Sequence, residues 1–68
     1  METVPQEVTR KLIQNQLTAW RTSMEDYRIA GIVAETLDDA AGKERVVKEM
    51  TKCVKAIEKL TAMLNELG

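Results

Sequence analysis

Several residue types are missing or rare in this chain of 68 residues. It has no histidine or phenylalanine, a single cysteine, and only two aromatic residues, Trp20 and Tyr27. One cysteine cannot form an internal disulfide, and one thiol without histidine does not provide the usual ligands of a zinc site. We therefore predict no metal and no cofactor. A domain this small then needs oligomerisation or a larger partner to be stable.

Charge and hydropathy exclude further classes of protein. Ten basic and eleven acidic residues give a net charge of −1, so no overall field attracts nucleic acid or an anionic membrane. The longest apolar stretch, residues 29–34, is far shorter than the ~20 residues of a membrane span, and no signal peptide is visible. The unpaired Cys53 is typical of a reducing compartment, so we expect a cytoplasmic protein.

The apolar residues form two heptad seams, in which successive members are alternately four and three residues apart. The first seam consists of Ile13, Leu17, Trp20, Met24, Tyr27, Gly31 and Ala34, and the second of Val46, Met50, Cys53, Ile57, Leu60, Leu64 and Leu67. This spacing predicts two amphipathic helices that pack together. The first seam, continued in phase, leads onto charged residues instead of the second seam. The chain is therefore expected to turn back between them.

We predict an all-α fold, an antiparallel helical hairpin that spans residues 1–68 as a single domain. The first helix covers about residues 5–37, the turn about 38–41 and the second helix about 40–66. Asp38 and Asp39 favour the turn because their side chains bond nearby backbone groups. The alternative is one long helix that absorbs the change of phase as a skip in a coiled coil.

Folding at this turn predicts a register in which the numbers of facing residues sum to about 78 or 79. The expected pairs are Gly31 with Val47, Tyr27 with Met50, Met24 with Val54, Trp20 with Ile57, Leu17 with Leu60 and Ile13 with Leu64. The first helix is expected to extend past the end of the second by roughly two turns, which leaves Val4 and Val8 without a partner inside the hairpin.

The segment of residues 29–34 is apolar on every side of a helix, so one partner helix cannot cover it. We therefore predict assembly, either as a homodimeric four-helix bundle or by docking on a larger protein. Trp and Tyr are frequent anchors of interfaces, and Trp20 and Tyr27 both belong to the first seam. The candidate interface residues are Trp20, Tyr27, Ile29, Ile32 and Val33.

A basic stripe lies opposite the second seam. It consists of Arg45, Lys48, Lys52, Lys55 and Lys59. The stripe suggests an anionic partner and makes a nucleic-acid-binding helical bundle the alternative function. No aromatic residues alternate with it for base stacking, and glutamates dilute it, so we favour a solvated face.

Four carboxylates lie near the expected turn, at Glu35, Asp38, Asp39 and Glu44, and oxygen ligands of this kind hold Mg²⁺ or Ca²⁺. The run Glu35-Thr-Leu-Asp38 resembles half of the Glu-x-x-Glu…Glu-x-x-Asp signature of all-α nucleotide pyrophosphohydrolases. That resemblance implies a metal-dependent nucleotide hydrolase as a second alternative. The other half is absent, as are a phosphate-binding loop and a histidine for acid–base catalysis. We therefore predict no enzyme and assign these residues to capping and solubility.

These observations favour a small non-enzymatic interaction or assembly module, such as an adaptor, a regulatory subunit or an inhibitor. Its expected partners are itself or a larger protein, with no membrane and no small-molecule substrate. In general outline the chain resembles the short helical accessory proteins of bacteriophage and bacterial genomes.

Overall fold

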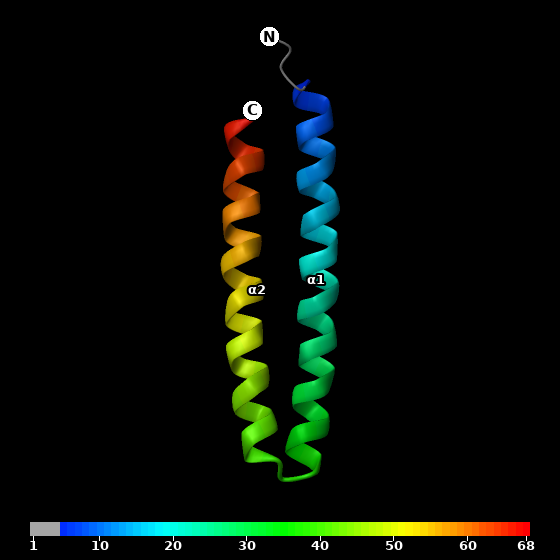
Figure 1. Ribbon diagram of the computed structural model, residues 1–68, viewed down its shortest axis with the longest axis vertical. Helices are drawn as coiled ribbons and strands as arrows, with labels where there is room; N and C mark the ends of the chain where they lie inside the picture. The colour runs from blue at the N-terminus through cyan, green and yellow to red at the C-terminus, as the bar shows by residue number, and fades with distance from the viewer. Residues whose placement is uncertain (1–4) are drawn as a thin grey trace.

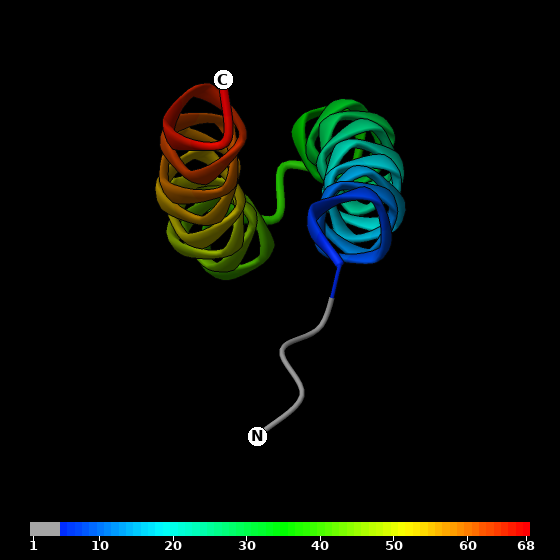
Figure 2. The same cartoon turned by 90° about the horizontal axis from the view of Figure 1, so that it is seen from above.

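The computed structural model describes residues 5–68, which form two long helices joined by a short turn (Figure 1). Helix α1 spans Gln6–Thr36 and helix α2 spans Ala40–Glu66. The helices run antiparallel and lie side by side in both views (Figures 1 and 2). The predicted all-α helical hairpin is therefore confirmed. The molecule is narrow, with principal extents of 55 × 20 × 14 Å.

The start of each helix has a distinct local cause. At α1, Pro5 is the N-cap, and its carbonyl oxygen accepts the N–H groups of Val8 and Thr9 at 3.0 and 3.2 Å. Glu7 places a negative charge in the first turn, at the positive end of the helix dipole. At α2, the Asp39 carboxylate accepts the N–H of Gly42 at 2.9 Å. This bond satisfies one of the N–H groups that the first turn of a helix leaves free.

The two adjacent aspartates build the turn in different ways. Asp38 adopts the left-handed conformation, with φ of 54°. Its N–H donates to the Glu35 carbonyl at 3.1 Å, and the N–H of Asp39 donates to the Ala34 carbonyl at 2.8 Å. These two bonds make a Schellman motif, which ends α1. Because Asp39 already caps α2, only residues 37–39 separate the helices, fewer than the turn of residues 38–41 that the sequence suggested.

Both predicted seams face the partner helix, because every seam residue is buried or partly buried. Cys53 is 1% exposed, and Leu17 is 4% exposed. Ile13, Leu17 and Leu60 form the central cluster, against which Trp20, Ile57, Met63, Leu64 and Leu67 pack. The core is therefore aliphatic and lies along the line of contact between α1 and α2.

The predicted sum of 78 or 79 is too large by one to two, although the predicted pairs Leu17 with Leu60 and Ile13 with Leu64 fit the core cluster. A Cβ atom added to Gly31 would lie 3.3 Å from Val46 Cγ1, so Gly31 lies against Val46 and not Val47, which is 64% exposed. Cys53 is likewise buried where Val54 was expected, and Val54 is 38% exposed. The Gly31–Val46 contact sets the sum of facing residue numbers at 77. The cause is the short turn, since one aspartate ends α1 and the next already caps α2.

α1 extends past the end of α2, as predicted, but only its first turn does so, which is less than the roughly two turns expected (Figure 1). Val8, in this turn, is 46% exposed. Val4, the other residue expected in the overhang, lies outside the described residues. Neither α1 nor α2 is long and apolar enough to cross a membrane.

Candidate interaction surface

Exposed apolar side chains are concentrated on α1. Among residues 5–68, eight large hydrophobic side chains are between 38 and 71% exposed. Two of them, Val47 and Val54, belong to α2. The other six belong to α1 or to the residue that ends it; they are Val8, Leu12, Ile29, Ile32, Val33 and Leu37. The predicted interface residues Ile29, Ile32 and Val33 are thus each about half exposed in the hairpin.

The helical period places most of these side chains on one continuous surface, which we call the α1 outer face. It comprises three neighbouring rows of α1 residues. These rows point away from α2 or lie directly beside the α1 seam, all on the same side of it. Its members are Val8, Thr9, Leu12, Asn15, Gln16, Ala19, Thr22, Ser23, Asp26, Ile29, Ala30, Val33, Thr36 and Leu37. All of them are exposed except Thr9 and Ser23, which are partly buried.

The α1 outer face is nearly free of charge. Residues 6–37 contain eight charged side chains, and only one of them, Asp26, belongs to this face. The other seven lie on the seam or on the opposite flank of α1. A solvated helix face normally carries charged residues, whereas the centre of a protein interface is depleted of them. The composition of the α1 outer face therefore matches an interface better than a solvent-facing surface.

Two polar side chains of this face donate to the backbone of their own helix. The Thr22 hydroxyl donates to the Thr18 carbonyl at 2.9 Å, and the Thr36 hydroxyl donates to the Ile32 carbonyl at 2.9 Å. Such hydroxyl donors need no water when another surface covers them.

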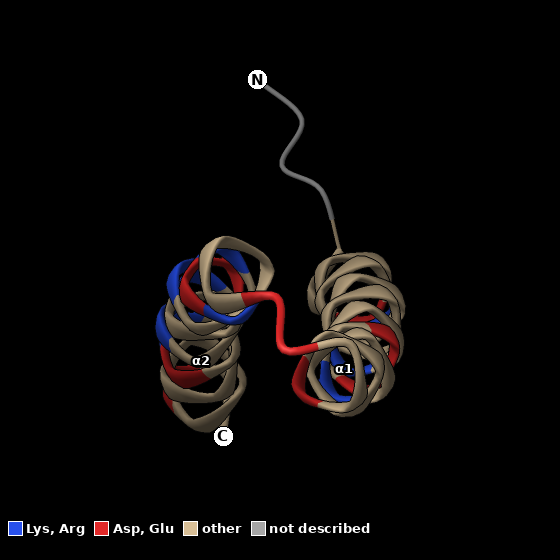
Figure 3. Cartoon of the chain, turned by 90° about the horizontal axis from the view of Figure 1, so that it is seen from below, with Lys and Arg blue, Asp and Glu red and all other residues tan. Residues whose placement is uncertain are grey.

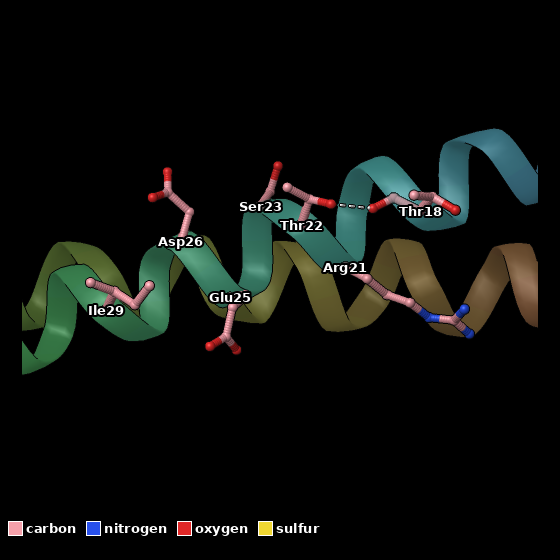
Figure 4. Close-up of a pocket in the computed structure, with 7 residues that line it drawn as sticks. All are labelled: Thr18, Arg21, Thr22, Ser23, Glu25, Asp26 and Ile29. Carbon is pink, nitrogen blue, oxygen red and sulfur yellow. Dashed lines mark hydrogen bonds between the residues drawn. The ribbon is translucent and has the colours of Figure 1, made fainter.

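A shallow depression lies at the middle of α1, where the side chains of Thr22 and Ser23 are short. It is lined by Thr18, Arg21, Thr22, Ser23, Glu25, Asp26 and Ile29 (Figure 4). Figure 4 shows Ser23 and Asp26 extending from one side of α1, and Arg21 and Glu25 from the other. The depression allows close approach of a second helix at this point.

A groove of about 280 Å³ lies where α1 ends and α2 begins, and we call it the tip groove. It is lined by Tyr27, Ala30, Val33, Ala34, Leu37, Asp39, Gly42, Arg45 and Val46. The structure thus brings the candidate residue Tyr27 beside Val33. Trp20, by contrast, packs on the core cluster between the helices, well along α1 from the tip.

The predicted basic stripe is exposed along its whole length on α2. Basic segments lie on the side of α2 away from α1, and acidic residues form the turn (Figure 3). Lys52 is paired with Glu49, with Nζ and Oε1 3.1 Å apart. Both aromatic residues are in α1 and partly buried, so no aromatic surface adjoins the stripe. This face of α2 has the composition of a solvated surface.

One ion pair on α1 has a defined geometry. The Arg28 guanidinium contacts the Glu25 carboxylate through two nitrogens, with Nε 3.0 Å from both oxygens and the second nitrogen 2.6 Å from Oε1. The hydrogen bonds from Arg28, and secondarily its charge, lower the pKa of Glu25 and exceed the opposing effect of desolvation. Both side chains are more than half exposed and lie outside the α1 outer face.

The acidic residues near the turn do not gather into a cation site. Across residues 5–68 no three carboxylate or thiol groups come close enough together to hold a metal ion. Asp39 uses its carboxylate to cap α2, as the capping interpretation expected. Cys53 is a buried free thiol in the core.

The apolar segment at the tip predicted only part of this surface. It did not point to Leu12, which is 56% exposed, or to Leu37, which is 71% exposed. The signal in the sequence that could have found them is the near absence of charge from three neighbouring stripes of the first helix. That signal becomes interpretable once the register shows which flank of α1 these stripes occupy.

No protein-family model, curated protein or solved structure matches this chain.

Proposed function

We propose that this chain is a non-enzymatic assembly module whose function is to bind protein, and that it self-associates as a dimer of hairpins in a four-helix bundle. The observation that carries this proposal is the α1 outer face, an exposed helix surface with several large apolar side chains and a single charge. In the cell this surface is expected to be covered. A free thiol in the core suits a reducing compartment, so we place the function in the cytoplasm.

The surface area of the hairpin supports self-association. The chain exposes 5489 Å². A compact monomer of 7.7 kDa exposes roughly 4,300 Å², so the chain exposes roughly 1,200 Å² more than that. A stable interface of standard size buries about 800 Å² on each partner. The excess is therefore of the size that one such interface removes.

The small core supports the same conclusion. Within residues 5–68 only five hydrophobic side chains are buried: Ile13, Leu17, Ala34, Cys53 and Leu60. Two helices alone bury one stripe each, and small domains of this size usually gain stability from disulfides, metals or oligomerisation. Dimerisation would add a second buried stripe to α1, as in a four-helix bundle.

Sedimentation equilibrium of the isolated chain, combined with far-ultraviolet circular dichroism at the same concentrations, tests this proposal. We expect a dimer at micromolar concentration that loses helix content as it dissociates on dilution. A helical monomer at all concentrations would refute self-association. A larger protein partner would then be the remaining candidate for covering the α1 outer face.

A further inference from the structure

We propose that a second copy of this chain occupies the α1 outer face, with the two α1 helices antiparallel and a twofold axis passing near Thr22 and Ser23. This inference rests on the proposed self-association and specifies its geometry. In this arrangement, facing residues of the two copies have numbers that sum to about 45, because a twofold axis between residues 22 and 23 relates them.

The distribution of apolar residues along the α1 outer face is close to symmetric about this axis. Val8 and Leu12 lie at one end, and Val33 and Leu37 lie at the other. The side chains between them are short or polar except Ile29, which faces Gln16 of the other copy in this arrangement. The axis brings Leu12 of each copy against Val33 of the other, and Val8 against Leu37. All four side chains are between 46 and 71% exposed in the hairpin, so each has surface to bury.

The tip groove fits this arrangement. Val33 and Leu37 line it together with Ala30. The first turn of α1, which carries Val8, extends past the end of α2 (Figure 1). Leu12, one turn further on, is 56% exposed beside α2, so a second copy can reach both side chains. The first two turns of α1 of one copy thus fill the tip groove of the other, and the same contact occurs twice.

The middle of the face suits a crossing point. Thr22 and Ser23 have short side chains, and the Thr22 hydroxyl already donates to the Thr18 carbonyl (Figure 4). Two helices approach most closely where side chains are small, and a hydroxyl satisfied within its helix loses no hydrogen bond when water is displaced.

Charge favours the antiparallel arrangement over a parallel one. A parallel pair would set Asp26, the one charge on the face, against its own copy, and would also join two acidic tips that carry Glu35, Asp38 and Asp39. Like charges held this close repel one another. The antiparallel pair places Asp26 opposite Ala19 and brings Glu35 of each copy level with Arg10 of the other, while Asp38 comes level with Glu7.

The outer surface of α2 is left free in this dimer. Its exposed Lys48, Lys52 and Lys55 face solvent, which is consistent with the charge that distinguishes α2 from α1. The second copy therefore packs on α1, and the basic stripe keeps the assembly in solution.

Two matched substitutions test which surface is used. Val33→Asp alters the α1 outer face, and Val47→Asp alters the exposed flank of α2; the two valines are 51 and 64% exposed. We expect Val33→Asp and Leu12→Asp each to raise the dimer dissociation constant by at least about a hundredfold in sedimentation equilibrium, since each buries two carboxylates per dimer. Val47→Asp should change it less than about threefold.

A charge-pair variant tests the antiparallel geometry. Leu12 and Val33 are about 30 Å apart along one helix, so they meet only between copies. In the double variant Leu12→Lys/Val33→Asp, the introduced ammonium of each copy faces the introduced carboxylate of the other. We expect it to dimerise at least tenfold more tightly than Val33→Asp alone.

The outcomes separate the two proposals. A wild-type chain that stays monomeric overturns self-association and this geometry with it. A wild-type dimer that Val47→Asp dissociates as strongly as Val33→Asp overturns the choice of the α1 outer face while leaving self-association intact. A dimer that both Leu12→Asp and Val33→Asp weaken but the double variant does not restore overturns the antiparallel arrangement alone.

Discussion

The two aspartates of the turn should respond in opposite directions to substitution, although they are neighbours of the same type. Asp38 has φ of 54°, a conformation that disfavours any residue with a Cβ atom. Relief of this strain by Asp38→Gly gains roughly 1 kcal/mol, and the greater freedom of glycine in the unfolded chain costs roughly 0.5 kcal/mol. The net effect is a stabilisation of roughly 0.5 kcal/mol.

Asp39 instead caps α2 through its bond to the Gly42 N–H. Asp39→Ala removes that bond and should cost about 1 kcal/mol. The two variants should therefore differ by about 1.5 kcal/mol, which corresponds to roughly 6–12 °C in Tm for a domain of this size. Thermal denaturation followed by circular dichroism measures this difference, with all variants at one protein concentration because dimerisation makes Tm depend on concentration.

Further variants separate conformation from charge. Asp38→Ala removes the same carboxylate as Asp38→Gly but keeps the Cβ atom, so the backbone strain remains and the variant should show none of the stabilisation expected of Asp38→Gly. Asp39→Asn keeps a side-chain acceptor and should be nearly neutral. Gly42→Ala should weaken the cap, because the added Cβ would overlap the Asp39 carboxylate. If Asp38→Gly lowers Tm as much as Asp39→Ala does, the Schellman motif and the cap assigned to this turn are incorrect.

Two further predictions concern the core and the surface of α1. Leu17 is 4% exposed, so Leu17→Ala should lower the free energy of unfolding by roughly 2–3 kcal/mol. Val47 is 64% exposed, so Val47→Ala should lower it by less than about 0.5 kcal/mol. Urea denaturation measures both, and equal midpoints for the two variants would contradict the assignment of Leu17 to the seam. Glu25 has a lowered pKa in the folded hairpin, so the stability it adds through Arg28 is present above its unfolded pKa and is lost as pH falls through the lowered value. The small Tm advantage of the wild type over Glu25→Gln at neutral pH should therefore disappear in acid, and an advantage that persists there would show that the carboxylate charge is not its source.

The candidate surface was only partly predictable from the sequence. The apolar segment of residues 29–34 pointed to Ile29, Ile32 and Val33, and all three are about half exposed. Leu12 and Leu37 were not selected because both lie outside the first seam and outside the apolar segment of residues 29–34. They join Val33 on one surface only when the packing of α1 on α2 shows which stripes of α1 remain uncovered.

The sequence by itself determined the helices, their seams and the region of the turn. Heptad spacing is a local property of the chain, and a change in its phase requires either a skip or a reversal, so the spacing alone assigns Leu17 and Leu60 to the core. The exact register was not fixed in this way, because the sum of facing residue numbers was taken from a turn expected at residues 38–41, which is longer than the turn that forms.

Only the tertiary structure decided that register. It depends on the backbone of two residues: Asp38 adopts the left-handed conformation that ends α1, and Asp39 begins α2 directly afterwards. Both are aspartates, and either one is a suitable cap or turn residue by type. With the turn built in this way, Gly31 accepts the contact with Val46, which leaves Val47 in solvent.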